Sequence, residues 1–410
     1  MKYKFTDYDD NENFSAVQEI DAGPEKKQSF HYALGLLLTT MALIVFGLTM
    51  LYSASSGAGS KAAVFFNNQL MWSVAGTLAG SIACIVGYRF LAKNSILWII
   101  GVSGLLVWAA CSRSINGARR WIHLGGYTFQ PSEIAKIVVA LFVAWYCAEN
   151  LRTFNNIKSK HGIVPLGAGV GVIVGLVAAG EDLGTTSLIC FMVFMTLVTA
   201  GLKWYYWCFA LGGATGIYVW IRYFDSMRWL RMIVFLDPEL HRADNGYQLW
   251  NGIMALGSGG WTGVGLMKSR LKANYLPEAH TDFILAVTGE ELGFVGICTV
   301  LLLYVLWGFF ALQIAFRSRD RMGLLAGWAL TVGIIVQALI NIGAMSGCFP
   351  TKGMPAPFIS YGGSNLLGCL IATGVLLSIA IENDMPDYSR NLWNRVKNLF
   401  NFSVRGGAGE

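Results

Sequence analysis

Asp282 is the residue of this chain best placed to do chemistry. It closes the run PEAHTD (277–282), directly before a long apolar stretch that predicts a helix, and basic residues crowd the segment that precedes it. A carboxylate at a membrane surface among Lys and Arg suits chemistry on an anionic, lipid-linked substrate. The position suits equally an N-cap by Thr281 or Asp282, worth about 1 kcal/mol, and one residue can fill both roles.

Two further acids, Glu290 and Glu291, follow about two helical turns deeper. At about 100° per residue, Glu290 lies about 80° around the helix from Asp282, and Glu291 lies on the opposite side. Carboxylates at membrane depth are costly and normally face a cavity or a partner. For Glu291 we expect a structural pairing with Lys or Arg of a neighbouring helix.

A second polar cluster joins the runs NGARRWI (116–122) and QPSEIAK (130–136). Pro131 suits the first position of a helix. Glu133 and Lys136 are three residues apart, so they share a helix face and can pair. A charged pair within a membrane helix indicates a functional site, and a purely structural ion pair is the alternative.

Two loops carry unusual backbone. The glycine-rich run 257–265 lacks the spacing of a P-loop or a dinucleotide fingerprint; its amides can cradle a phosphate, or its glycines serve only as turns. The Pro- and Gly-rich run 350–364 forbids a regular helix, and such backbone survives at membrane depth only where it is buried or lines a wet cavity. Gln337 and Asn341, four residues apart, form one polar face that suits contacts between helices.

Composition sets the class of protein. Of 410 residues, 55% are hydrophobic and only 13% are charged, about half the charged fraction of a soluble domain, and the mean hydropathy is +0.51. Segments such as 33–51 are long enough to cross a bilayer. The eight Cys form no C-x-x-C pair, and no metal-ligand or Ser-His-Asp spacing appears. We therefore predict an all-α, polytopic integral membrane protein, and the net charge of +6 does not indicate nucleic acid.

About ten transmembrane helices are expected. Their predicted positions are 33–53, 68–88, 95–111, 132–149, 164–180, 184–201, 204–222, 283–315, 323–346 and 363–382. The eighth, at about 50 Å, exceeds the bilayer core and should project outward or tilt. A long external loop, about 223–282, separates the seventh from the eighth, and its Trp and Tyr predict short helices at the membrane interface.

Charge and composition predict the termini and the orientation. Residues 1–31 are polar and mixed in charge, as expected of a disordered cytoplasmic tail. The membrane domain is expected over 32–384, with a cytoplasmic C-terminal tail over 385–410. Lys and Arg are more frequent in the loops assigned to the inside than in the short external loops, which places both termini in the cytoplasm.

Several long motifs together resemble one known family. They are NGARRWI, QPSEIAK, DLGT, ALGSGG, LPEAHTDF followed after six residues by GEELG, and PTKGMPAPFISYGGS. In order and spacing they are similar to the SEDS family (shape, elongation, division and sporulation; FtsW, RodA and SpoVE), and they look more like the cell-division branch, FtsW, than the elongation branch. The chain departs from the family pattern at Gly180-Glu181 before DLGT and at Asn365 after GGS.

The resemblance implies a ten-span fold and a peptidoglycan glycosyltransferase that polymerises lipid II at the outer face of the bacterial cytoplasmic (inner) membrane, at the division septum. It implies a class B penicillin-binding protein as partner, with other division proteins of the membrane. The family's catalytic acid corresponds to Asp282. The residues predicted to bind substrate are Arg119, Glu133, Lys136, Ser269, Arg270, Lys272, Gln337, Asn341 and Ser360.

The chemistry needs only one carboxylate. Asp282 is expected to take the proton of an attacking sugar hydroxyl, while the lipid pyrophosphate leaves as a stable anion. Glycoside hydrolases need two carboxyl groups because their leaving alkoxide must be protonated. Arg119, Lys136 and Arg270 are candidates to stabilise the pyrophosphate, and a divalent cation, Mg²⁺ or Mn²⁺, is a candidate to share that work. Two other functions stay open: a lipid II flippase, and a non-catalytic scaffold that activates a penicillin-binding protein.

Overall fold

The long helices follow the predicted spans closely. The computed structural model describes residues 28–56, 61–112, 119–125, 127–244, 246–270, 280–351 and 353–385. Within these ranges the ten long helices are α1 (Gln28–Ser55), α2 (Lys61–Val86), α4 (Ser95–Cys111), α5 (Pro131–Glu149), α6 (Ile163–Ala179), α7 (Leu183–Ala200), α8 (Tyr205–Phe224), α12 (Ile284–Phe316), α13 (Arg321–Met345) and α14 (Gly363–Asp384). Seven of them are long and apolar enough to cross a membrane by length and composition, and α4 and α6 are shorter apolar helices.

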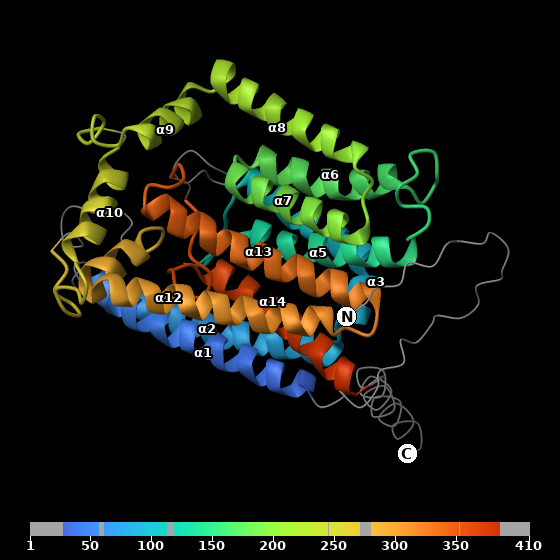
Figure 1. Cartoon of the computed structure of the whole chain (residues 1–410), viewed down its shortest axis with the longest axis horizontal. Coiled ribbons are helices and arrows are strands. Elements are labelled where there is room, and N and C mark those ends of the chain that lie inside the picture. Colours follow the sequence, from blue (N-terminus) through green and yellow to red (C-terminus); the bar gives the residue numbers. More distant parts are fainter. Residues whose placement is uncertain are drawn as a thin grey trace.

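The helices lie side by side and alternate in direction (Figure 1). All the connections predicted to be external therefore gather at one end of the bundle, at the left in Figure 1, together with the short helices α9 (Ser226–Leu236) and α10 (Tyr247–Ser258). We call this the loop end. The two short helices between the seventh and eighth spans confirm that this loop is partly helical, and the all-α fold class is confirmed.

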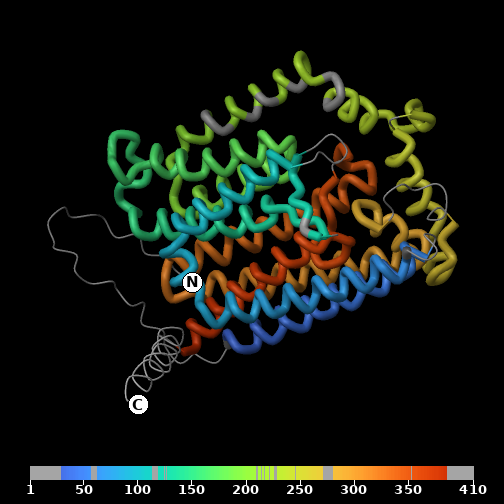
Figure 2. Tube along the Cα trace, turned by 180° about the vertical axis from the view of Figure 1, so that it is seen from behind, coloured from blue at the N-terminus to red at the C-terminus, as the bar shows by residue number. Residues whose placement is uncertain are grey.

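The centre of the bundle is formed by α5 and α14. In the most apolar 18-residue stretch of each of these two helices, 78% is buried inside the protein, compared with 28% for the same length of α2. Helix α2 packs against α14 with the two backbones in contact, because a Cβ atom at Gly374 would lie 2.0 Å from the carbonyl oxygen of Gly80. Seen from behind, α8 runs along one edge of the bundle (Figure 2). The charges of Glu133 and Lys136 on α5 therefore lie in the protein interior rather than against lipid.

Two local features differ from the prediction. The eighth span is not one continuous helix, because Gly293 has φ 67° and ψ −161° and breaks α12 about two turns from its start. In the loop before α5, β1 (Ile122–Leu124) and β2 (Tyr127–Phe129) pair as a short antiparallel hairpin, with Ile122 opposite Phe129. The hairpin delivers the chain to Pro131, which occupies the first turn of α5 as predicted.

Candidate active site

Asp282 lies at the loop end and is anchored through its backbone. Its carbonyl oxygen accepts a hydrogen bond of 3.0 Å from Nδ2 of Asn341, on α13. Two residues earlier, the carbonyl of His280 accepts a 3.0 Å bond from the amide of Tyr361, and the His280 ring stacks on Phe65 of α2 at 4.6 Å between ring centroids. Three elements distant in sequence thus fix the segment that carries the carboxylate.

Capping does not explain this carboxylate. The N-cap of α12 is Phe283, and no side chain at that position hydrogen-bonds the first turn. The capping alternative for Thr281 or Asp282 is therefore wrong. The Oδ2 atom of Asp282 instead lies against Gly353, where an added Cβ atom would be 3.0 Å away. The missing side chain at Gly353 leaves room for the carboxylate at the start of the Pro-rich loop.

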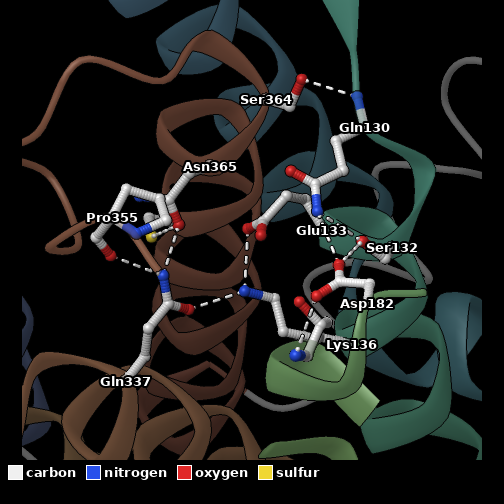
Figure 3. A network of polar contacts seen from close by, with 11 residues as sticks. Gln130, Ser132, Glu133, Lys136, Asp182, Gln337, Pro355, Ser364 and Asn365 are labelled. Carbon is white, nitrogen blue, oxygen red and sulfur yellow. Dashed lines mark hydrogen bonds and ion pairs between the residues drawn. The ribbon is translucent and has the colours of Figure 1, made fainter. Parts of the chain in front are cut away.

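Lys136 forms the centre of a buried polar network (Figure 3). Its Nζ lies 2.8 Å from Oε2 of Glu133, which confirms the predicted pair, and donates a 2.6 Å bond to Oε1 of Gln337. The nitrogen of the Gln337 amide group fixes its orientation. Nε2 donates to the carbonyl of Pro355 and to Oδ1 of Asn365, both at 2.9 Å, so Oε1 faces the lysine. The ammonium group is thus held between a carboxylate and a carbonyl that faces it.

The Pro-rich loop joins this network to Asp282. On α13, Gln337 donates to the carbonyl of Pro355, and Asn341 donates to the carbonyl of Met354 at 2.8 Å as well as to Asp282. The polar face predicted for α13 therefore contacts two helices, through Lys136 of α5 and Asn365 of α14, and it also holds this loop. Both side chains come from one helix, so a shift of α13 would move the Asp282 segment and the Lys136 network together.

Asp182 forms a second centre beside it (Figure 3). Its carboxylate accepts bonds from Nε2 of Gln130 at 2.8 Å and from the hydroxyl of Ser132 at 3.1 Å. It also caps α7 by accepting from the amide of Thr185, and Oδ1 lies 3.7 Å from Nη1 of Arg120. The sequence patterns assigned Asp182 no role in a site, and its place in the motif DLGT beside an expected helix start was the available signal.

Glu290 and Glu291 are buried, at 3% and 0% exposure. Both carboxylates bind the end of the long loop. The amides of Met267 and Ser269 donate to Glu291, and the hydroxyl of Ser269 and the amide of Arg270 donate to Glu290. These donors were not predicted, because nothing in the sequence pairs the loop with this turn of α12.

The glycine-rich run also serves this contact rather than forming an open phosphate cradle. The amides of Gly263, Val264 and Gly265 are already donated to carbonyl oxygens of the protein. A Cβ atom at Gly259 or Gly263 would lie 1.9 or 2.1 Å from a carbonyl oxygen of α12. The glycines are required for close packing of two backbones.

Three of the remaining predicted residues lie apart from these two networks, and the fourth is not described. Arg119 is exposed, and its carbonyl lies beside the turn at Gly180. The side chain of Arg270 is exposed. The Ser360 hydroxyl accepts from the amide of Ala356 within the Pro-rich loop. Lys272 lies outside the described residues. The roles of these four in substrate binding stay predictions.

Candidate metal ligands are not grouped in the part of the chain that the structure describes. No group of three or more His, Cys, Asp or Glu side chains there is placed to hold a metal ion. A small cavity of about 30 Å³ adjoins Glu133, Lys136 and Gln337, enough for about one water molecule and too small for a sugar.

The fold and the site define a polytopic helical membrane protein with an anchored carboxylate and a buried charged network at one end of its bundle. A family model of cell cycle proteins, FtsW/RodA/SpoVE, matches residues 34–385. The chain belongs to this family.

Curated relatives match over most of their length. A probable peptidoglycan glycosyltransferase FtsW of Polynucleobacter necessarius is 36% identical over 402 residues, covering 91% of this chain and 92% of the relative. The same kind of protein from Trichlorobacter lovleyi is 33% identical over 359 residues, covering 85% and 93%.

Solved structures share the fold. A chain from work on the structural coordination of polymerization and crosslinking by a peptidoglycan synthase complex aligns with a TM-score of 0.72 and 26% identity, covering 86% of this chain and 98% of that one. The rod shape determining protein RodA of Thermus thermophilus aligns with a TM-score of 0.63 and 24% identity, covering 85% and 96%.

Proposed function

We propose that this protein is a peptidoglycan glycosyltransferase of the FtsW type, which polymerises lipid II into glycan strands, and that Asp282 is its general base. The family and the relatives support the enzyme class. The observation that carries the assignment of the base is the anchoring of the Asp282 segment by Asn341, Tyr361 and Phe65 at the loop end. A general base must be held in a fixed geometry toward the proton that it removes.

Four other carboxylates near this end make contacts within the protein. Glu133 pairs with Lys136, and Asp182 accepts bonds from Gln130 and Ser132. Glu290 and Glu291 accept bonds from the long loop. We assign these four acids structural contacts with neighbouring helices and with the long loop. Asp282, beside Gly353, which has no side chain, is the one proposed to act on substrate.

The reaction balances with one base. The hydroxyl of one lipid-linked disaccharide attacks the anomeric carbon of another, and its proton passes to Asp282. The bond from the anomeric carbon to the pyrophosphate oxygen breaks, and the lipid pyrophosphate leaves as an anion. That leaving group needs neutralisation of its charge rather than a proton, a role that fits the exposed side chains of Arg119 and Arg270.

Lys136 supports the site from inside. It is held 2.8 Å from Glu133 and is turned toward Gln337, so it contributes positive charge below the Pro-rich loop rather than direct contact. A divalent cation stays a proposal. Because the described residues form no three-ligand group, the oxygens for such an ion would have to come mainly from the substrate phosphates.

The partner and the location are part of the proposal. A synthase complex that coordinates polymerization and crosslinking is the setting of one structural neighbour. It supports a class B penicillin-binding protein as the crosslinking partner of this chain. We place the complex in the bacterial cytoplasmic membrane at the division septum, with the loop end outside.

The test is polymerisation of purified lipid II by the purified protein, with and without its partner, whose own active site is blocked. Asp282→Ala and Asp282→Asn should reduce strand formation by a factor of about 10² or more, since a positioned general base contributes about 10²–10⁴. Thermal unfolding of both variants, measured alongside, separates a loss of catalysis from a loss of the fold.

Strands made at the wild-type rate by Asp282→Asn would exclude Asp282 as the base. No strands from the wild-type protein under any condition would contradict the enzyme itself. Lipid II translocation in vesicles would then separate a flippase from a scaffold.

A further inference from the structure

The last part of the long loop is fastened to α12 at the break in that helix. The amides of Val264 and Gly265 donate 3.0 Å bonds to the carbonyls of Glu290 and Glu291. In the opposite direction, the amide of Phe294 donates to the carbonyl of Gly260 at 2.9 Å. The break at Gly293 makes these α12 backbone groups available, because a continuous helix would use them internally.

Beyond this backbone contact, two carboxylates accept hydrogen bonds from three residues further along the loop, Met267, Ser269 and Arg270. Oε2 of Glu291 accepts from the amide of Met267 at 3.0 Å, and Oε1 accepts from the amide of Ser269 at 3.3 Å. Oε1 of Glu290 accepts from the amide of Arg270 at 2.8 Å, and its Oε2 accepts from the Ser269 hydroxyl. We call residues 267–270, with Glu290 and Glu291, the loop clamp.

The clamp also reaches the first helix. The hydroxyl of Ser53, on α1, donates to Oε2 of Glu291. Met267 has φ 64°, in the left-handed region that non-glycine residues rarely adopt. Surrounding contacts must hold such a residue in place, and the Glu291 carboxylate supplies one of them directly through the Met267 amide.

We propose that Glu290 and Glu291 are positioning residues of the transferase, which hold the loop so that Arg270 stands at a fixed place at the loop end. This inference rests on the proposed function. Arg270 is tied to Glu290 on one side, and His280 is tied to Tyr361 on the other. The clamp therefore fixes the loop as far as Arg270.

The two acids differ in a way that allows a sharp test. Glu291 receives two backbone N–H groups, one on each oxygen, and an N–H group cannot become an acceptor. A Gln at 291 would point its own N–H₂ at one of them. Glu290 receives one N–H group and one hydroxyl. A Gln at 290 keeps its oxygen for Arg270 and donates to Ser269, because a hydroxyl can reverse its role.

Purified full-length Glu291→Gln and its matched control Glu290→Gln should therefore behave differently. We expect Glu291→Gln to lower kcat/KM for lipid II polymerisation at least about tenfold, because a buried N–H group loses its acceptor. Glu290→Gln should stay within about threefold of wild type. Since the clamp positions the charge of Arg270 for an anionic substrate, the loss should appear mainly as a raised KM. Simple instability would instead lower the amount of active enzyme, and so the apparent kcat, without a change in KM.

Limited trypsin digestion reports the clamp without reference to activity. Cleavage after Lys268 requires the Ser269 amide to leave Glu291. Wild type and Glu290→Gln should resist cleavage there, and Glu291→Gln should be cut at least about tenfold faster. If Glu291→Gln fails to fold, Glu291→Asp takes its place. It keeps two acceptor oxygens and brings no donor, so raised KM and faster cleavage are again expected from the shorter reach.

Equal behaviour of the two Gln variants in both measurements would overturn the proposal, as would rapid cleavage of the wild type after Lys268. An increase in cleavage with unchanged KM would show a clamp that does not serve substrate. Absence of activity in the wild type would instead count against the proposed function, and the digestion would still decide whether the clamp exists.

Discussion

At the scale of single residues, the site depends on charges that are buried together. The Lys136 side chain is only 13% exposed and the Glu133 side chain 5%. Taking two charges out of water is costly, and removal of one partner leaves the other uncompensated. The side-chain carbonyl of Gln337 accepts a hydrogen bond from the lysine. The orientation of that carbonyl depends on Pro355 and Asn365. Asn365, one of the two places where the sequence departs from the expected family pattern, is therefore part of the support of Lys136.

Glu133→Ala should destabilise the protein by about 3–5 kcal/mol, because Lys136 would stay buried without its carboxylate. The double variant Glu133→Ala with Lys136→Met should be clearly more stable than Glu133→Ala alone. Thermal unfolding of both single variants and the double variant in the same detergent measures the coupling. Additive effects of the two changes would show that the pair contributes no interaction of its own.

At the scale of elements, the break in α12 is the feature that assembles the outer part of the site. Gly293 separates the first two turns, which carry Glu290 and Glu291, from the long lipid-crossing part. A Cβ atom at Gly293 would lie 2.4 Å from the amide nitrogen of Gly263, and its φ of 67° disfavours other residues. The long loop is therefore attached where the helix is interrupted.

Gly293→Ala should lower stability by about 2 kcal/mol or more, from the strained backbone and from the clash with the loop, and should reduce polymerisation. Gly171→Ala is the matched control. It lies in α6, and a Cβ atom there meets nothing within 4 Å, so no loss is expected. Unfolding temperature and lipid II polymerisation measured for both would test the role of the break; equal effects would contradict it.

At the scale of the whole molecule, the alternation of ten helices collects the polar network, the Pro-rich loop and the Asp282 segment at one end. The opposite end carries its own contacts. Arg89 lies 3.1 Å from Asp320 and 3.2 Å from Glu382, which ties the connection after α2 to the start of α13 and the end of α14. Burial and the nearby Asp320 carboxylate raise the pKa of Tyr88, which donates to Asp320.

The excess of Lys and Arg in the loops away from the loop end predicts that the loop end lies outside the cell. In a cysteine-free background, Trp261→Cys, at a position 75% exposed at the loop end, should react with a membrane-impermeant thiol reagent in intact spheroplasts. Ile157→Cys, at a position 55% exposed between α5 and α6, should react only after permeabilisation. The reverse pattern would invert the proposed orientation.

The sequence by itself determined the class, the spans and the family. Apolar runs of bilayer length are a local property, so ten helices and their approximate limits follow without tertiary information. The i, i+3 spacing of Glu133 and Lys136 was equally sufficient for their pairing, which the structure confirms at 2.8 Å. Motifs of several residues identified the family, and they marked Asp282 as the candidate base.

Only the tertiary structure decided what the buried acids hold and where the helix is interrupted. Glu291 accepts from Ser53, 238 positions earlier in the chain, and from a loop more than twenty positions before it. No periodicity encodes a contact of that kind. Gly293 breaks α12 because the loop backbone packs directly against it. Asp282 is anchored by α13, α2 and the Pro-rich loop, because the alternating helices bring these elements to one end of the bundle.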